Sequence, residues 1–140
     1  MSVSKKHGAG FVIFREDTIG SEKPLVLALI QDDGVYDIPK GRIDEGESEL
    51  LAAKRECFEE SSIVVQDDDM LFSPFKSGPL TTFCAKTNKV PHITVNPHSG
   101  ILEHAGYEWV TKDQFCNNCL NYLISPVEHF YSAHSKAYNV

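Results

Sequence analysis

The hydrophobic pattern of the chain begins with two short apolar runs, Gly10–Phe14 and Leu25–Ile30. Both runs contain β-branched residues and predict strands. The segment between them, Asp17–Pro24, is polar and contains Gly20, which is typical of a hairpin loop. Two strands joined by a loop are therefore predicted near the start of the chain.

A helical pattern follows in Glu49–Ser61, which contains neither Gly nor Pro. Ser48 lies directly before it and suits the N-cap position, because its hydroxyl can accept a hydrogen bond from the first turn. The apolar residues fall into two stripes, one of Leu50, Ala53 and Cys57 and one of Leu51 and Phe58. The pattern predicts a helix that is buried on two sides and carries acids on the remaining side.

The second half of the chain shows two more strand patterns, Leu80–Ala85 and Tyr107–Val110. Thr111–Tyr122 is predicted to be a helix, and Pro126 opens a further predicted helix over Val127–Lys136. Strands, a central helix, further strands and closing helices together indicate mixed α/β layers. A chain of 140 residues is of common single-domain size and can bury a substantial core.

Three acids of the predicted central helix, Glu56, Glu59 and Glu60, are spaced i, i+3 and i+4 and so share one face. Like charges at this spacing repel by roughly 0.2–0.5 kcal/mol per pair on a helix surface. The face either holds a hard divalent cation such as Mg²⁺ or Mn²⁺ through oxygen ligands, or is a solvated acidic face. Upstream, Pro39 and Gly41 favour a tight loop with backbone carbonyls free to meet a ligand.

The segment from Gly41 to Ile63 resembles the signature of the Nudix hydrolase family, G-x5-E-x7-R-E-U-x-E-E-x-G-U, in which U is aliphatic. The matching positions are Gly41, Glu47, Arg55, Glu56, Glu59, Glu60 and Ile63. Two positions depart from the pattern. Cys57 replaces an aliphatic residue, which is a mild change because cysteine is small and apolar. Ser62 replaces a glycine that serves the helix exit, where a positive φ is convenient.

This resemblance implies an α/β (α+β) fold, a Nudix-type mixed β-sheet sandwiched between helices, in a single domain over residues 1–140. It also implies hydrolysis of a phosphoanhydride bond in a compound linked to a nucleoside diphosphate, with Mg²⁺ or Mn²⁺ as cofactor. By the match of positions, Glu56 and Glu60 are the expected principal metal ligands and Glu59 supports them. The Gly41 carbonyl is a further candidate ligand.

The resemblance also assigns roles around the metal. Either Glu56 or a downstream carboxylate accepts the proton from water, and Glu103 is the downstream candidate because many family members carry an extra Glu before a similar strand. The alternative is that Glu103 is an ordinary exposed loop acid. Arg55 is expected to point away from the acids and to pair with Glu47, in a structural role. His104 either contacts phosphate or, as is more common for a lone loop histidine, is a surface residue.

The substrate is less well defined. Tyr36–Gly41 and Leu102–Val110 look most like the corresponding segments of diadenosine polyphosphate hydrolases. Lys40 and Arg42 either supply charge for a long phosphate chain or are solvated loop residues. Hydrolysis of ADP-ribose or nucleotide sugars, processing of RNA 5′ ends, and a catalytically inactive nucleotide-binding module remain alternatives. The possible base-stacking residues are Tyr107, Tyr122 and Tyr131, and the sequence does not choose among them.

Composition narrows the possible partners and the location. The net charge of −7 argues against nonspecific nucleic-acid binding, and it counts somewhat against a long RNA substrate. No apolar stretch approaches the ~20 residues that span a bilayer, so no membrane is expected. Met1–Lys6 is polar and lacks the apolar core of a signal peptide, which favours a cytoplasmic location with four free thiols. A small nucleotide is the expected partner.

One further motif must be weighed against this picture. Cys116 and Cys119 are followed by His129 and His134, which superficially suggests a Cys₂His₂ zinc site. Nine residues separate Cys119 from His129, fewer than the roughly 12 of a zinc finger. The segment also corresponds to the closing helices that the resemblance implies. We therefore expect ordinary thiols in place of a zinc site.

Overall fold

The structure is a computed structural model that describes residues 7–140. Met1–Lys6, on which the expectation of no signal peptide depends, lies outside the described residues. In the part of the chain that is described, no helix is both long enough and apolar enough to cross a bilayer.

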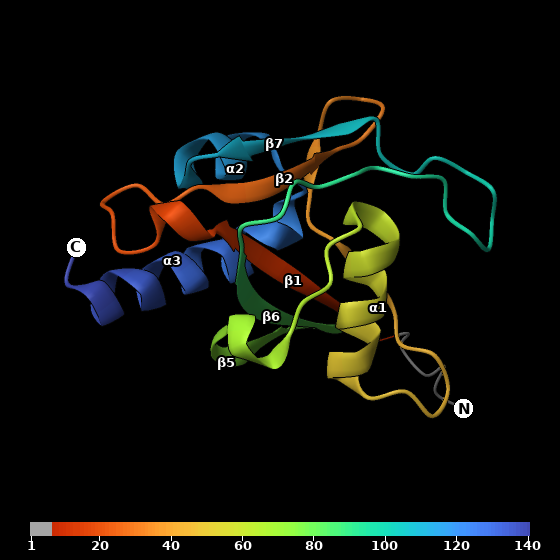
Figure 1. The fold of residues 1–140 in the computed structure, drawn as a ribbon, viewed down its shortest axis with the longest axis horizontal. Helices are drawn as coiled ribbons and strands as arrows, with labels where there is room; N and C mark the ends of the chain where they lie inside the picture. Colours follow the sequence, from red (N-terminus) through yellow and green to blue (C-terminus); the bar gives the residue numbers. More distant parts are fainter. Residues whose placement is uncertain (1–6) are drawn as a thin grey trace.

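A mixed sheet of seven strands runs through the middle of the molecule (Figure 1). The strands are β1 (Gly8–Arg15), β2 (Val26–Ile30), β3 (Tyr36–Asp37), β4 (Lys40–Arg42), β5 (Met70–Ser77), β6 (Leu80–Thr87) and β7 (Gly106–Val110). The main path is β3–β2–β1–β6–β5, while β4 pairs with β1 and β7 pairs with β2. Among these strands of residues 7–140, β1 and β6 pair in parallel and the other pairs are antiparallel.

Helices cover both faces of this sheet. The α-helices are α1 (Glu49–Ser61), α2 (Lys112–Asn118) and α3 (Ile124–Tyr138), and the short 3₁₀ helices are η1 (Glu16–Thr18), η2 (Asp67–Asp69) and η3 (Asn121–Leu123). In Figure 1, α1 lies on one side of β1 and β6, and α3 crosses the other side. The predicted sheet between helices is confirmed.

The central strand β1 explains why both faces need a cover. Successive side chains of a strand point to opposite faces. Phe11 and Ile13 pack into the core layer of α1, whereas Val12 and Phe14 pack into the layer of α2 and α3. All four side chains are fully buried. An apolar run without polar alternation is therefore the pattern expected of a strand that is covered on both sides.

The helix that carries the acids begins and ends where the sequence predicts. The Ser48 hydroxyl accepts a hydrogen bond of 3.1 Å from the amide of Leu51, as expected of an N-cap. The prediction of burial on two sides was wrong. Ala53 and Cys57 are buried against the sheet, but Leu51 and Phe58 are 60% and 53% exposed. Only one side of α1 meets the sheet, so the second apolar stripe faces outward.

The predicted helix over Thr111–Tyr122 is shorter in the structure. α2 ends at Asn118, and Cys119 then forms an isolated parallel bridge with Tyr36 of β3. The amide of Leu120 also donates to the Tyr36 carbonyl, at 3.3 Å. This pairing with a distant strand stops the helix, and η3 follows before α3 begins. Pro126 lies inside the first turn of α3, where its missing N–H costs little.

Three strands were not predicted. β3 and β4 are only two and three residues long, and β4 includes Gly41, which was expected to lie in a tight loop. β5 is a partly exposed edge strand whose pairing with β6 shifts register between Leu71 and Phe75. Phe72, inside that irregularity, has a φ of 60°.

Candidate active site

A hollow of about 800 Å³ opens at the edge of α1 that carries the acids. α1 contributes Glu56, Glu59 and Glu60 to its lining, and the loop of residues 88–105 between β6 and β7 contributes Glu103 and others. The structure therefore brings together acids that lie more than 40 positions apart in the chain. Every glutamate that the sequence analysis placed at a metal lines this one hollow.

The acidic side chains of α1 are drawn inward. Glu60 is only 7% exposed, and the side chains of Glu56 and Glu59 are 12% and 10% exposed. The backbone of Gly41 lies so close to Glu56 that a Cβ atom at this position would overlap the Glu56 carboxyl group. A larger residue here would push the Glu56 carboxyl group aside, so glycine at the first position of the motif lets the β4 backbone lie this close to the acid.

Arg55 holds this acidic face together. Its Nε and Nη2 bind the two carboxylate oxygens of Glu47 at 2.8 and 3.0 Å, in the bidentate geometry that favours arginine over lysine. Its Nη1 lies 2.8 Å from Glu56 and 3.3 Å from Glu59, and its Nη2 donates to the Arg42 carbonyl. The predicted pairing with Glu47 is present. The expectation that Arg55 points away from the acids was wrong.

One arginine does not neutralise the cluster. The hydrogen bond from Arg55 lowers the pKa of Glu47. Burial, by contrast, raises the pKa of Glu56 and of Glu60, and the neighbouring Glu56 carboxyl raises that of Glu60 further. Neighbouring buried carboxyl groups such as these ionise with difficulty, and a small divalent cation bound between them would stabilise their charged forms. The donor set of carboxylate oxygens, with the Gly41 backbone close by, fits Mg²⁺ or Mn²⁺.

A buried polar network lines the same hollow beside Glu60. Asp37 is 3% exposed and lies 3.1 Å from Lys40 Nζ and 3.1 Å from His104 Nε2. Burial opposes the charged form of Asp37, but the His104 hydrogen bond and the Lys40 ammonium outweigh it, so its pKa is lowered. His104 is buried, so the expectation of a surface position for it was wrong.

Lys40 and Arg42 occupy different environments. Burial lowers the pKa of Lys40, but the Asp37 carboxylate and Tyr122 raise it by more, so the net shift is upward. Lys40 is therefore a half-buried, paired cation. Arg42 is exposed and lies on the rim of the same hollow. Of the three tyrosines considered for base stacking, only Tyr122 lies nearby, with Lys40 Nζ 5.7 Å from the centre of its ring.

Glu103 is exposed, and the Nδ2 of Asn96 donates to it at 3.4 Å. One ligand atom from each of Glu60, Glu103 and His104 lies within 4.8 Å of the others. His98 also reaches the hollow, with its Nε2 3.4 Å from a Glu59 oxygen. Asp37, Asn96 and His98 were not predicted as site residues from the sequence. Asp37 lies two residues before Pro39, where a tight loop was predicted, whereas no local signal places Asn96 or His98.

The Cys₂His₂ alternative is not formed by the described residues. His134 Nε2 accepts the Gly20 amide at 2.9 Å, and the His129 ring stacks on Phe75 with a centroid distance of 4.2 Å. The thiol of Cys119 donates to the carbonyl of Cys116. These side chains therefore have other partners, as expected for ordinary thiols and histidines.

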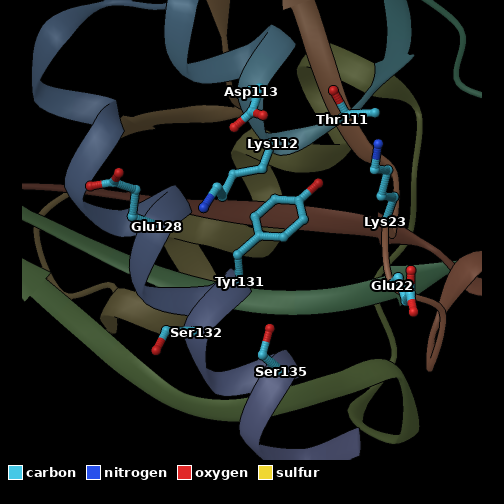
Figure 2. Close-up of a pocket in the computed structure, with 9 residues that line it drawn as sticks. All are labelled: Glu22, Lys23, Thr111, Lys112, Asp113, Glu128, Tyr131, Ser132 and Ser135. Atoms are coloured by element: carbon cyan, nitrogen blue, oxygen red, sulfur yellow. The ribbon is translucent and has the colours of Figure 1, made fainter. Parts of the chain in front are cut away.

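A second hollow of about 480 Å³ lies beside α3 and the start of α2 (Figure 2). Its lining carries both charge signs, from Glu22, Lys23, Lys112, Asp113 and Glu128. The hydroxyl of Tyr131, another of the considered tyrosines, donates to the Pro24 carbonyl at 2.6 Å and so has a structural partner. None of the acids of α1 lines this hollow, and the candidate chemistry lies at the first one.

Residues 5–123 match the family model described as NUDIX domain. Among solved structures, a C. elegans Ap4A hydrolase has a TM-score of 0.70 at 20% identity, covering 94% of this chain and 99% of that one. A MutT protein from Methanosarcina mazei Go1 gives 0.68 at 18% identity, with 96% and 99% covered. The E. coli dihydroneopterin triphosphate pyrophosphohydrolase gives 0.67 at 20% identity, with 95% and 99% covered. A comparison with curated protein sequences finds no significant match.

Proposed function

The chain belongs to the Nudix family of hydrolases, and on that premise we propose that it is a Mg²⁺- or Mn²⁺-dependent pyrophosphohydrolase of dinucleoside polyphosphates, such as diadenosine tetraphosphate. The observation that carries this proposal is the convergence of Glu56, Glu59 and Glu60 with Glu103 on one hollow. We take residues 1–140 as one domain that contains the whole site.

The metal would be held by Glu56 and Glu60, with Glu59 in support and the Gly41 carbonyl beside them. A divalent ion bound there offsets the charge of the phosphate oxygens and lowers the pKa of the attacking water. The close approach of Gly41 to Glu56 and the raised pKa values of Glu56 and Glu60 support this assignment.

The remaining residues position the metal ligands and accept the proton of the attacking water. Arg55 and Glu47 act as positioning residues, because their bidentate pair ties the loop after β4 to α1. Glu103 is the favoured acceptor for the proton of water, since it is an exposed loop carboxylate that lines the hollow. Glu56 is the alternative acceptor, at the cost of its role as a ligand.

The preference for a dinucleoside polyphosphate is supported by what surrounds the acids. A neighbouring hollow of about 480 Å³ shares Lys40, Gly41 and Arg42 with the first and adds Leu80 and Tyr122. A chain of phosphates leaving the acid cluster would meet the two cations and bring a base to Tyr122. The similarity in fold to an Ap4A hydrolase agrees with this substrate class.

The test is product analysis by ion-exchange chromatography with Mg²⁺ or Mn²⁺ and a panel of substrates. We expect diadenosine tetraphosphate to be cleaved faster than ADP-ribose, a nucleotide sugar or an RNA with a 5′-triphosphate. Faster cleavage of one of these others would replace the proposed substrate with that class. Binding of a nucleotide without any product would favour the inactive binding module.

Variants connect that activity to the site. Glu56→Gln and Glu60→Gln should each reduce kcat by several orders of magnitude, whereas Glu103→Gln should cost about 10–100-fold, the usual size of a general-base effect. Glu45→Gln is the matched control, because Glu45 is an exposed acid of the same segment that does not line the hollow. Near-normal turnover in both the Glu56 and Glu60 variants would contradict the mechanism.

A further inference from the structure

The imidazole of His104 is built into the wall of the acidic hollow. The residue is 4% exposed, although it follows the exposed Glu103 directly in the 88–105 loop. The next residue, Ala105, donates its amide to the Ile30 carbonyl at 2.7 Å. The end of β2 therefore fixes the backbone beside the ring, and His104 cannot swing freely into solvent.

Asp37 determines which ring nitrogen of His104 carries the free lone pair. Its Oδ2 lies 3.1 Å from His104 Nε2, and its Oδ1 accepts the amide of Ile38 at 2.8 Å and lies 3.1 Å from Lys40 Nζ. A carboxylate can only accept hydrogen bonds, so Nε2 must be the donor in this pair. In the neutral ring the lone pair then resides on Nδ1, for which no hydrogen bond is found among residues 7–140.

The same ring lies among the acids. A ring nitrogen of His104 and carboxylate oxygens of Glu60 and Glu103 all lie within 4.8 Å of one another. Two ligands that bind one ion at about 2.0–2.2 Å are at most roughly 4.4 Å apart, so movements of a few tenths of an ångström would let His104 and Glu60 reach a shared ion, with Glu103 beside it as the proton acceptor. A histidine that donates one N–H to a carboxylate while the other nitrogen binds metal is a recurrent arrangement.

We propose that His104 is a direct metal ligand through Nδ1, that Asp37 is its positioning residue, and that the site consequently prefers Mn²⁺ or Co²⁺ to Mg²⁺. This inference rests on the metal site of the proposed function and deepens it. Magnesium favours oxygen ligands in near-ideal octahedral geometry, whereas imidazole favours first-row transition ions. A nitrogen ligand beside Glu60 therefore changes which ion the hollow selects.

Electron spin-echo spectroscopy of the Mn²⁺-loaded protein tests the inference without relying on turnover. We expect ¹⁴N modulation from a directly bound imidazole in the wild-type protein. His104→Gln should abolish this modulation while Mn²⁺ still binds, and it should reduce the preference for Mn²⁺ over Mg²⁺ by about 10-fold or more. Asp37→Asn should keep the modulation and weaken Mn²⁺ binding by about 10–100-fold, the usual effect of losing such a partner.

His98→Gln is the matched control, because His98 also reaches the hollow but contacts Glu59 from an exposed position. Its ¹⁴N modulation should equal that of the wild type. Wild-type protein labelled with ¹⁵N-histidine needs no substitution, and there the modulation should change from the ¹⁴N to the ¹⁵N pattern. This measurement covers the case in which a His104 variant does not fold.

Three results would overturn the inference: bound Mn²⁺ without histidine modulation, an unchanged signal in His104→Gln, or loss of the signal in His98→Gln. If Mn²⁺ binds and the substrate is cleaved without any nitrogen signal, only the role of His104 fails. If neither Mn²⁺ nor Mg²⁺ binds to the folded protein, even with substrate present, the proposed function fails with it.

Discussion

At the scale of single residues, the negative charge of the acidic cluster is only partly balanced by the protein itself when no metal is bound. Arg55 contacts Glu47, Glu56 and Glu59, but within residues 7–140 Glu60 accepts a hydrogen bond only from the amide of Lys40, at 3.3 Å. Glu60 is also the most buried acid of the helix. Its carboxyl group therefore contributes most of the electrostatic cost of folding the metal-free site.

This cost predicts the pH dependence of stability. The pKa of Glu60 is raised above its unfolded value near 4.5, so the metal-free native state binds more protons than the unfolded state above that pH. The free energy of unfolding should then fall as the pH rises from about 5 through neutrality. Denaturant titrations at a series of pH values in EDTA measure this slope, which Glu60→Gln should flatten and added Mg²⁺ should counteract.

The control for this slope is Glu45→Gln, which removes an exposed acid outside the hollow and should leave the slope unchanged. A stability of the metal-free wild type that rises over the same pH range would show that Glu60 ionises easily, against the burial described above.

The acids of α1 could be predicted from the sequence because they lie within one helical turn and a half, where spacing alone fixes their shared face. Asp37 and His104 could not, because their 3.1 Å contact joins positions 67 residues apart. Arg55 was predicted on the wrong side for a similar reason. A helical wheel gives the direction of Cβ, but the long guanidinium side chain reaches both Glu47 and the acidic face.

At the scale of elements, the end of α1 is coupled to the loop that carries Glu103. Ser62 replaces the expected glycine and adopts a φ of 64°, a left-handed conformation that costs a non-glycine residue roughly 1 kcal/mol. Its hydroxyl donates to the His92 carbonyl at 2.9 Å, and the His92 amide donates to the Ser61 carbonyl at 2.8 Å. The serine therefore adds a tether that glycine cannot provide.

Substitutions at Ser62 separate the strain from the tether. Ser62→Gly relieves the strain but removes the hydroxyl, so we expect global stability to change by no more than about 1 kcal/mol. Amide hydrogen exchange should nevertheless become faster in residues 92–105 and stay constant within α1. Ser62→Ala loses the tether and keeps the strain, so it should show the same faster exchange with a lower unfolding free energy. Unchanged exchange of the loop in both variants would exclude a tether.

Helices and strands were predictable from the sequence where burial gives them a continuous apolar pattern. β1 and β6 are buried almost throughout, and their apolar runs predicted them. β5 is an edge strand with several exposed residues, and its interior Pro74 is typical of edges and bulges. The helical pattern of Thr111–Tyr122 was broken by the bridge between Cys119 and Tyr36, a long-range contact that local periodicity does not contain.

At the scale of the whole molecule, the two core layers meet at the parallel pair of β1 and β6. Thr82 lies in this pair opposite Gly10, and it is fully buried. Its hydroxyl oxygen has no hydrogen-bond partner among the described residues. The neighbouring Thr81 points to the other face, where its hydroxyl donates to the Glu49 carboxylate at the start of α1. The two adjacent threonines thus differ in whether a hydrogen bond compensates for the burial of the hydroxyl group.

Replacing each threonine by the nearly isosteric valine tests this difference on the free energy of unfolding. An unpaired buried hydroxyl costs about 1–3 kcal/mol, so Thr82→Val should stabilise the protein by about 1 kcal/mol. Thr81→Val should destabilise it by a similar amount, because it removes the hydrogen bond to Glu49 and leaves that carboxylate only its contact with Lys76. Urea titrations with a common m-value would measure both changes on one cooperative transition. Destabilisation in both variants would mean that the Thr82 hydroxyl has a partner in solution, and that the sheet centre between the two layers is not dry.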